Sequence, residues 1–593
     1  MIKYSTYNLY IYNFTTHVIM SISIKNLLLH ERSGLAVALT EKDFNNVLTM
    51  KSRTNLLNWL FKISEKLDLD PLVFFQTISM IDVCIKHLGM LPKDLRLIGV
   101  SCLIISSKKY DIDNVCARDI VKQCQHEFTR GDINAKELEI MKFIGFNVEF
   151  SNVLDYIKYI SCTIDDAEGD TKDYTESNLL ATFLCNYYYC NNVDCLLPSV
   201  IATASFFIAS SFLTNCILKN PFKLHLSVIE LACKLIANSF LESKNKECVN
   251  IIKKYLKIFE EDRLVEYVKI FNEGLLEILP FEEYTVGYFS NFEATKTYPS
   301  KKDFKKIQRL GGGSYGDVHK VIHKVSKVEC AMKVSGFEND DSIRQSFIRE
   351  VSILKNVRHK NIVKILDVLS RAEGFLLELM DSDLKFFSQS NEYILKSSFS
   401  LQEKISCDLL SAVEYIHSLG ILNRDIKPQN ILVRGNWDPH SPENLEIKLC
   451  DFGLSKGQAV LPFDAYYTTN VCTMWYRPPE LLLGCLKYNC KIDVWSVACT
   501  LYEIFTNKVL FAGKSEIDQL YIIFYSLGKP KNDSWEGVEA FPNYNDSWVN
   551  WEKERDFFDL PISKNVIKVL EKCLTLNPAK RPMVSEILRE LKK

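Results

Sequence analysis

Residues 423–430 read NRDIKPQN, and this stretch decides how the second half of the chain folds. A carboxylate at Asp425 can orient a hydroxyl group and accept its proton, while Lys427 can neutralise a phosphoryl group in transfer. Asn430 can bind Mg²⁺, and Asp451, in the later segment Asp451-Phe452-Gly453, supplies a second metal ligand. Because phosphoryl transfer depends mainly on positioning and charge neutralisation, these residue types in this order predict that reaction.

A glycine-rich turn lies upstream of this stretch. Its pattern, GxGxxGxV, is formed by Gly311, Gly313, Gly316 and Val318. Glycines let the backbone approach phosphate oxygens closely and donate N–H groups to them. Dinucleotide-binding turns share this spacing but lead into a helix, whereas a strand follows the glycines here. The pattern therefore predicts a loop over the phosphates of a nucleotide.

A lysine and a glutamate complete the candidate nucleotide site. Ala331-Met332-Lys333 ends a following strand, and a lysine there can pair with the α- and β-phosphates. Glu350 lies on the next predicted helix and can hold Lys333 in place by an ion pair. Each residue alone is more often a solvated surface charge, so the prediction depends on their order in the chain.

The apolar pattern predicts a small β-rich lobe followed by a larger helical lobe. The chain becomes mostly helical after Leu401. Before it, a helix is expected at Ser342–Val357, and short strands are expected at Ile307–Leu310, Val318–Val325, Val328–Val334, Ile365–Leu369 and Phe375–Met380.

Residues 303–593 resemble a eukaryotic protein kinase, and in particular the cyclin-dependent kinases. The segments that carry the resemblance, beyond those above, are FIRE at 347–350, DFGL at 451–454, TMWYRPPELLLG at 473–484 and DVWS at 493–496, together with Arg581. The resemblance implies an α+β bilobal fold that transfers the γ-phosphate of ATP, with Mg²⁺, to proteins. The Lys427 variant of the catalytic loop implies serine or threonine as the acceptor.

The resemblance also implies roles for individual residues. The catalytic residues are Asp425, Lys427, Lys333 and Glu350, and the metal ligands are Asn430 and Asp451. The residues that bind ATP are Gly311, Gly313, Gly316, Val318, Ala331, Lys333, Glu378 and Met380.

Regulatory positions carry over in the same way. Thr468 matches the position phosphorylated in the activation loop of this family, and the cations placed to bind its phosphate are Arg349, Arg424 and Lys456. Lys456 stands where the family usually has arginine. Ser314 and Tyr315 match sites of inhibitory phosphorylation, although Tyr315 is equally consistent with a packing aromatic. Arg477 and the segment before it resemble those that select proline after the phosphoacceptor.

Two further features depart from the family pattern. Asn423 replaces the usual histidine of the catalytic loop, whose role in the family is to buttress the metal-binding turn. Gly435–Leu445 is a polar, proline-containing insertion, which we expect to form a surface loop.

The first half of the chain has helical periodicity throughout residues 52–285. Leu95–Ser107 is apolar on nearly every side, which predicts a helix at the centre of a bundle. Arg53 and Asp82 are charges amid apolar helices, and an unpaired buried charge is very costly, so we expect them to pair.

Residues 50–160 resemble the first cyclin box, and residues 175–285 more loosely resemble the second. The matching segments include RTNLLNWL at 53–60, MID at 80–82 and LPSVIA at 197–202. Lys108 and Glu137 match the polar pair by which cyclins hold the kinase helix that bears Glu350. Ile348 then matches the apolar anchor of that helix.

Composition is consistent with an ordinary intracellular globular protein. The net charge is -2, which gives no overall basic field for nucleic acid or membrane. The 19 cysteines lie mostly in apolar runs, which favours buried thiols over a disulfide framework. Leu196–Leu213 approaches the ~18–20 residues of a membrane span, but Pro198 and several Ser and Thr residues interrupt it, so we predict a buried helix. No signal peptide is expected, and a cytoplasmic or nuclear location follows.

These observations predict a multidomain chain. An all-α cyclin fold of two helical boxes is followed by a protein kinase. The predicted domains are a 1–49 extension, cyclin boxes at 50–160 and 175–285, a linker at 286–302 and a kinase at 303–593.

The main hypothesis is a protein kinase that acts on protein substrates and pairs with its own cyclin within one chain. Two alternatives stay open. One is an inactive scaffold, supported by Asn423 alone. The other is a cyclin that activates a separate kinase. Cell-cycle proteins and the repeat tail of RNA polymerase are both open as substrates.

Overall fold

The computed structural model describes the chain in stretches. They are residues 50–88, 94–110, 117–124, 127–148, 198–214, 297–313, 316–334, 344–441, 444–457, 472–485, 488–551 and 561–591, with scattered helical residues within 153–188 and 232–236. The described residues fall into two compact units. The helical unit holds those between 50 and 236 together with residues 344–348, and the bilobal unit holds residues 297–334 and 349–591.

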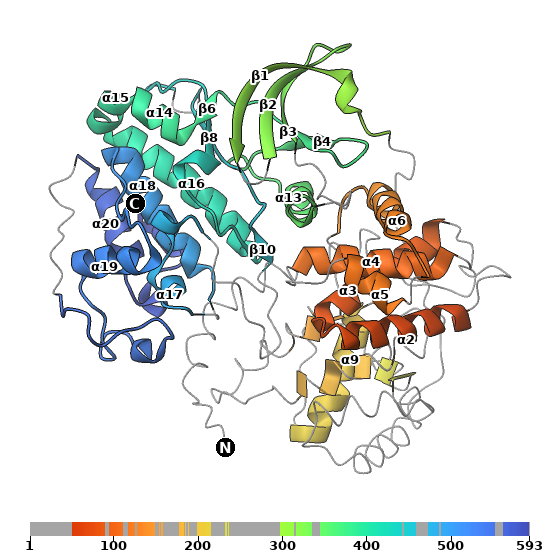
Figure 1. Cartoon of the computed structure of the whole chain (residues 1–593). Coiled ribbons are helices and arrows are strands. Elements are labelled where there is room, and N and C mark those ends of the chain that lie inside the picture. The colour runs from red at the N-terminus through yellow and green to blue at the C-terminus, as the bar shows by residue number, and fades with distance from the viewer. Residues whose placement is uncertain are drawn as a thin grey trace, which may run out of the picture. The chain divides into compact units, whose positions relative to one another are not determined.

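The helical unit is built from amphipathic and fully buried helices. Its described helices are α2 (Met50–Lys66), α3 (Pro71–Leu88), α4 (Leu95–Tyr110), α5 (Ala117–Gln123), α6 (Arg130–Phe143) and α9 (Pro198–Thr214), shown in Figure 1. A capping box begins α6, because the Thr129 side chain accepts the N–H of Asp132 and the Asp132 carboxylate accepts the N–H of Thr129.

Helix α4 is the centre of this unit, as its all-round apolar sequence predicts. It contacts α2, α3 and α6, and its side chains from Ile98 to Ser107 are buried. Gly99 lets α2 approach closely, since a Cβ atom there would lie only 2.9 Å from a Leu56 methyl carbon and 3.0 Å from one of Leu60. Burial on every side explains why the sequence of α4 has no polar face.

The predicted charge pair of this unit is confirmed. Arg53 Nε donates to Asp82 Oδ1 at 2.7 Å, and Arg53 Nη2 donates to Asp82 Oδ2 at 2.8 Å. Both side chains are buried, so the two parallel bonds compensate the cost of removing the charges from water.

From Pro198 on, the predicted apolar stretch forms α9, and its residues from Ser199 to Ser205 are buried. No helix in the described ranges is long and apolar enough to cross a membrane. The cysteines of these ranges carry free thiols, most of them buried. Most of the predicted second cyclin box lies outside the described residues.

The smaller lobe of the bilobal unit is an antiparallel sheet with strand order β1-β2-β3-β5-β4. Its elements are β1 (Phe304–Gly313), β2 (Gly316–His323), β3 (Glu329–Val334), β4 (Ile365–Val368) and β5 (Phe375–Leu377), with helix α13 (Gln345–Asn356) between β3 and β4. Val321, Met332 and Leu376 form its core together with Cys330 and Leu369. The sheet therefore places the glycine-rich turn, which joins β1 to β2, at one end of a rigid hairpin.

The larger lobe is mainly helical (Figure 1). Its helices are α14 (Leu384–Ser390), α15 (Glu392–Ser397), α16 (Phe399–Ser418), α17 (Pro479–Leu482), α18 (Lys491–Thr506), α19 (Glu516–Leu527), α20 (Lys564–Cys573) and α21 (Val584–Leu591). Its short strands are β6 (Ser382–Asp383), β7 (Ile421–Leu422), β8 (Ile431–Arg434), β9 (Glu446–Leu449) and β10 (Lys456–Gly457). Residues 423–430 join β7 to β8 within this lobe.

The predicted insertion at 435–445 joins β8 to β9, which pair as an antiparallel hairpin. Gly435 begins the turn at a φ of +86°, and a Cβ atom there would lie 1.9 Å from the Asn444 carbonyl oxygen. Only glycine fits this close approach.

The predicted fold class is confirmed: a helical region precedes a lobe with a five-stranded antiparallel sheet and a helical lobe. The predicted linker ended at residue 302, whereas the bilobal unit already includes Thr297. There the Ser370 N–H donates to the Pro299 carbonyl at 2.9 Å, which ties this segment to the smaller lobe.

Candidate active site

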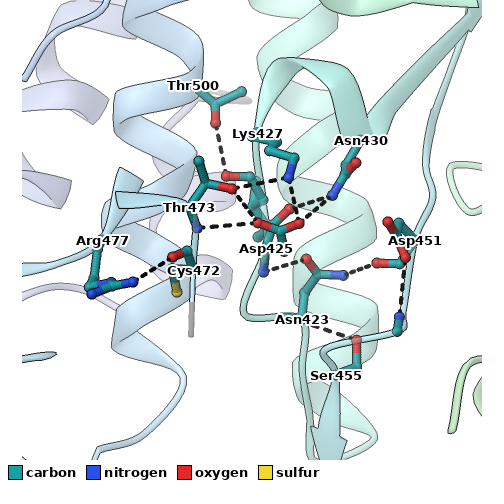
Figure 2. A network of polar contacts seen from close by, with 12 residues as sticks. Asn423, Asp425, Lys427, Asn430, Asp451, Ser455, Cys472, Thr473, Arg477 and Thr500 are labelled. Carbon is teal, nitrogen blue, oxygen red and sulfur yellow. Dashed lines mark hydrogen bonds and ion pairs between the residues drawn. The ribbon is translucent and has the colours of Figure 1, made fainter. Parts of the chain in front are cut away.

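The carboxylate of Asp425 is the centre of a polar network (Figure 2). Lys427 Nζ donates to Asp425 Oδ2 at 2.7 Å, and Asn430 Nδ2 donates to the same oxygen at 2.9 Å. Asp425 is only 4% exposed, so these bonds hold a charged group in a largely dry site. The three residues come from one stretch of eight, as the sequence predicts.

Thr473, whose role the sequence does not predict, joins this network from a segment 48 residues away. Its Oγ1 and N–H donate to Asp425 Oδ1 at 2.8 and 3.3 Å, and its Oγ1 accepts from Lys427 Nζ at 3.0 Å. The threonine therefore holds both the Asp425 carboxylate and the Lys427 side chain. The TMWYRPPE segment was the available signal, but sequence alone did not reveal this contact.

The oxygen donors of Asn430 and Asp451 fit a Mg²⁺ ion. Asn430 uses Nδ2 to donate to the Asp425 carbonyl and carboxylate, both at 2.9 Å, which leaves Oδ1 as the atom for a cation. Asp451 Oδ1 accepts from the Gly453 N–H at 3.2 Å and from Lys333 Nζ at 3.1 Å. Hard oxygen donors of this kind are what Mg²⁺ prefers.

Lys333 and Glu350 form the predicted ion pair, with Lys333 Nζ at 2.8 and 2.7 Å from the two carboxylate oxygens. Burial alone lowers the pKa of Lys333, but the charges of Glu350 and Asp451 outweigh burial and raise it. Burial raises the pKa of Glu350 to about 7, and Lys333 opposes that shift. The two short bonds and the raised pKa of Lys333 both favour an ammonium that stays charged and correctly placed.

The two ends of the glycine-rich turn lie beside Lys333. Gly313 pairs with Gly316 across the hairpin, and Val318 pairs with Lys333 on the adjacent strand. A Cβ atom at Gly311 would meet nothing within 4 Å, whereas one at Gly312 would lie 2.1 Å from Arg309 Nη2. Backbone N–H groups of glycines beside a fixed ammonium suit the phosphates of a nucleoside triphosphate.

The remaining predicted ATP residues lie on β3 and after β5. Ala331 and Met380 are buried, and Ala331 pairs with Leu377 across the sheet. The Glu378 carboxylate accepts from Lys448 Nζ, with both oxygens at 2.9 Å, and from the Lys364 N–H at 2.9 Å. The carboxylate of Glu378 is therefore engaged within the protein, and its N–H donates to the Lys364 carbonyl at 3.0 Å.

The predicted phosphate-binding arginines contact main-chain carbonyls. Arg349 Nη1 donates to the Gly453 carbonyl at 3.0 Å, and Arg424 Nε donates to the Leu454 carbonyl at 2.7 Å. Lys456 lies on β10, while Thr468, Ser314 and Tyr315 lie outside the described residues. Arg349 and Arg424 therefore both bind the backbone of the segment that follows Asp451.

Cys472 and Arg477 form a contact close to Thr473 (Figure 2). Cys472 has a φ of +63°, an uncommon conformation for a residue with a side chain. Its carbonyl oxygen accepts from Arg477 Nη2 at 3.1 Å. The rotated carbonyl is therefore occupied by an arginine of the same chain.

In the helical unit, Lys108 Nζ lies 2.6 Å from Glu137 Oε1, and Glu137 is fully buried. Ile348, the predicted apolar anchor, is also fully buried. Beside it in the sequence, the ring of Phe347 meets that of Phe146 edge to face, with centroids 6.1 Å apart. The two predicted polar residues thus lie together, and residues 344–348 belong to the same compact unit.

Comparisons with known proteins agree with this geometry. A family described as protein kinase domain matches residues 304–591, and one described as cyclin, N-terminal domain, matches residues 25–149, which includes part of the predicted 1–49 extension. The chain is 42% identical over 277 residues to the protein named Cyclin-dependent kinase 1 of Encephalitozoon cuniculi (strain GB-M1), covering 44% of this chain and 90% of that protein. The chain thus belongs to the cyclin-dependent protein kinase family, and its kinase domain follows a cyclin domain in the same polypeptide.

Proposed function

We propose that this protein kinase transfers the γ-phosphate of ATP to serine or threonine followed by proline, and that its own cyclin domain activates it. The observation that carries the proposal is the joint contact of Asp425 with Lys427, Asn430 and Thr473. This arrangement presents a carboxylate, a cation and a metal-binding amide within one network. Phosphoryl transfer needs these three elements.

The chain's own residues account for the steps of the reaction. Lys333, held by Glu350, orients the α- and β-phosphates below the glycine-rich turn. Asp425 orients the acceptor hydroxyl and accepts its proton, while Lys427 neutralises charge on the phosphoryl group. Mg²⁺, when held by Asn430 and Asp451, supplies further charge neutralisation at the phosphates.

Serine or threonine suits the position of Thr473. Its hydroxyl and N–H tie the chain at residue 473 directly to the Asp425 carboxylate. A substrate backbone that lies along this segment is therefore close to the carboxylate, and a short hydroxyl side chain suffices to reach it. This supports a Ser/Thr acceptor over the longer tyrosine.

The preference for proline rests on the occupied Cys472 carbonyl. A substrate N–H that faces it has no acceptor there, because Arg477 already donates to that oxygen. Leaving a buried donor unsatisfied costs about 1–3 kcal/mol. Proline has no N–H and avoids this cost.

Arg477→Ala is expected to relax this preference, because the Cys472 carbonyl becomes free to accept a substrate N–H. The ratio of kcat/KM for Ser-Pro over Ser-Ala peptides should be about 5- to 150-fold in the wild type. It should fall to within roughly 3-fold in the variant, as one hydrogen bond is regained. The matched control is Glu516→Gln, which removes the charge of a half-exposed partner of Arg477 but leaves the Cys472 contact. A variant that keeps the wild-type ratio would contradict this origin of selectivity.

Activation in cis is supported by the covalent fusion. Linked modules have effective concentrations up to the mM range when their geometry permits contact. Residues 344–348 of the kinase match belong to the same compact unit as the cyclin helices, and Glu350 follows two residues later. A cyclin that binds this segment would favour the arrangement in which Glu350 holds Lys333.

The specific activity of the full-length chain is expected to stay constant on dilution from about 1 μM to about 1 nM, because intramolecular pairing does not depend on concentration. Mixing provides the second test. The variant Lys108→Ala alters the residues proposed to bind the kinase helix, and the variant Asp425→Asn alters the catalytic loop. If pairing is intramolecular, an equimolar mixture of the two variants should be no more active than the separate variants. Recovery of activity in the mixture, or a steep loss on dilution, would indicate pairing in trans.

A further inference from the structure

We propose that Asn423 is a positioning residue that couples the catalytic aspartate to the metal-binding aspartate through its side-chain amide. This inference rests on the proposed kinase function and concerns the residue at which the chain departs from its family. Asn423 is fully buried and lies two residues before Asp425. It is the one feature of the sequence that favours an inactive scaffold, so what its side chain contacts bears directly on that alternative.

The backbone N–H and carbonyl of Asn423 are both hydrogen-bonded, to Asp493 and Ser455. The Asp493 carboxylate accepts the N–H groups of Asn423 and Arg424, each at 2.9 Å, and contacts His417 Nε2 at 2.8 Å. The Ser455 hydroxyl donates to the Asn423 carbonyl at 3.3 Å. These bonds use every backbone polar group of Asn423 and leave the side-chain amide to act elsewhere.

The side chain bridges two segments (Figure 2). Its Oδ1 accepts the N–H of Asp425 at 3.1 Å, and its Nδ2 donates to the carbonyl of Asp451 at 3.3 Å. The amide orientation follows from its partners, because a backbone N–H only donates and a carbonyl only accepts. One side chain therefore connects the residue that receives the proton to the residue that would hold the metal.

The bond from Asn423 Nδ2 to the Asp451 carbonyl is made where the backbone has an uncommon conformation. Asp451 has a φ of +60°, in the sparsely populated left-handed region. Fixing its carbonyl fixes the peptide plane between Asp451 and Phe452, next to the carboxylate that bonds Lys333 and Gly453. Partners that orient a metal ligand are typically worth 10- to 100-fold in metal affinity or activity.

Three substitutions distinguish the contributions of the two hydrogen bonds made by the Asn423 amide. Asn423→Asp keeps the acceptor for the Asp425 N–H but has no donor for the Asp451 carbonyl, and Asn423→Leu has neither. Asn423→His can present one donor and one acceptor. The matched control is Asn361→Asp, because Asn361 is also buried and donates from Nδ2 to the Ile447 carbonyl at 2.9 Å, outside the active site.

The test uses the full-length chain and two measurements. The first is kcat and peptide KM with Mg-ATP. The second is the Mg²⁺ concentration that gives half-maximal binding of a fluorescent ATP analogue, which requires no turnover. We expect Asn423→Asp and Asn423→Leu to lower kcat by roughly 10- to 100-fold and to raise the Mg²⁺ requirement by roughly 3- to 10-fold. Peptide KM should be unchanged, and Asn423→His should recover most of both losses.

The control separates a general loss of stability from a specific effect on Mg²⁺ binding. Asn361→Asp should lower the melting temperature with no change in the Mg²⁺ requirement. The proposal is overturned if Asn423→Asp retains wild-type kcat and Mg²⁺ requirement, or if its losses match those of Asn361→Asp. An inactive wild type would refute the kinase function, while the binding measurement would still decide whether Asn423 orients Asp451.

Discussion

Asp425→Asn is expected to lower kcat by about 10²- to 10⁴-fold at little cost in stability. The amide keeps the shape of the carboxylate but cannot accept the proton of the acceptor hydroxyl, and proton transfer by a positioned group contributes this much. It also loses the charge to which Lys427 and Thr473 are bound. The measurement is steady-state phosphate transfer from Mg-ATP to a Ser-Pro-x-Lys peptide.

The matched control is Asp408→Asn. Asp408 is also a buried aspartate of the larger lobe and is paired with Lys404 on α16, away from the catalytic loop. It should leave kcat within about 2-fold of wild type, because no reacting group contacts it. If Asp425→Asn retained a rate close to that of Asp408→Asn, Asp425 would not be the catalytic base.

Much of the fold and site could be predicted from the sequence where the signal is local. Asp425, Lys427 and Asn430 lie within six residues of one another, so the part of the network that they form could be expected from sequence. The Lys333–Glu350 pair was predictable because strand β3 and helix α13 follow directly in the chain. Helix α4 was predictable because burial on all sides leaves a sequence without a polar face.

Contacts between distant segments were not predictable in the same way. Thr473 reaches Asp425 across 48 residues and Asp493 supports Asn423 across 70, and no periodicity encodes such a meeting. The substitution at Asn423 was visible, yet its meaning depended on whether an amide could reach the Asp451 carbonyl. A positive φ at Cys472 likewise leaves no mark in the sequence, since cysteine has no special preference for that region.

Arg581→Ala is expected to cause a large loss of stability in the kinase domain. Arg581 Nη1 and Nη2 each lie 2.6 Å from an oxygen of Glu480, and both side chains are almost completely buried. The guanidinium also donates to the carbonyls of Thr575 at 2.7 Å and Leu576 at 3.0 Å, and lies 5.1 Å from the ring centroid of Trp495. Its removal leaves a buried carboxylate without its counter-charge, which costs about 3–5 kcal/mol.

The loss should appear as a fall of roughly 6–15 °C in the melting temperature of the kinase transition, followed by tryptophan fluorescence of the full-length chain. The matched control is Arg434→Ala, whose partner Glu446 is 41% exposed in its side chain against 2% for Glu480. Its second partner, Glu378, keeps Lys448 as a counter-charge in this variant. An exposed pair of this kind contributes about 0–1 kcal/mol, so the control should shift the transition by no more than about 3 °C. The double change Arg581→Met with Glu480→Gln should recover part of the loss, because most of it comes from the orphaned charge. Equal melting temperatures for Arg581→Ala and Arg434→Ala would show that burial adds nothing to the contribution of this ion pair.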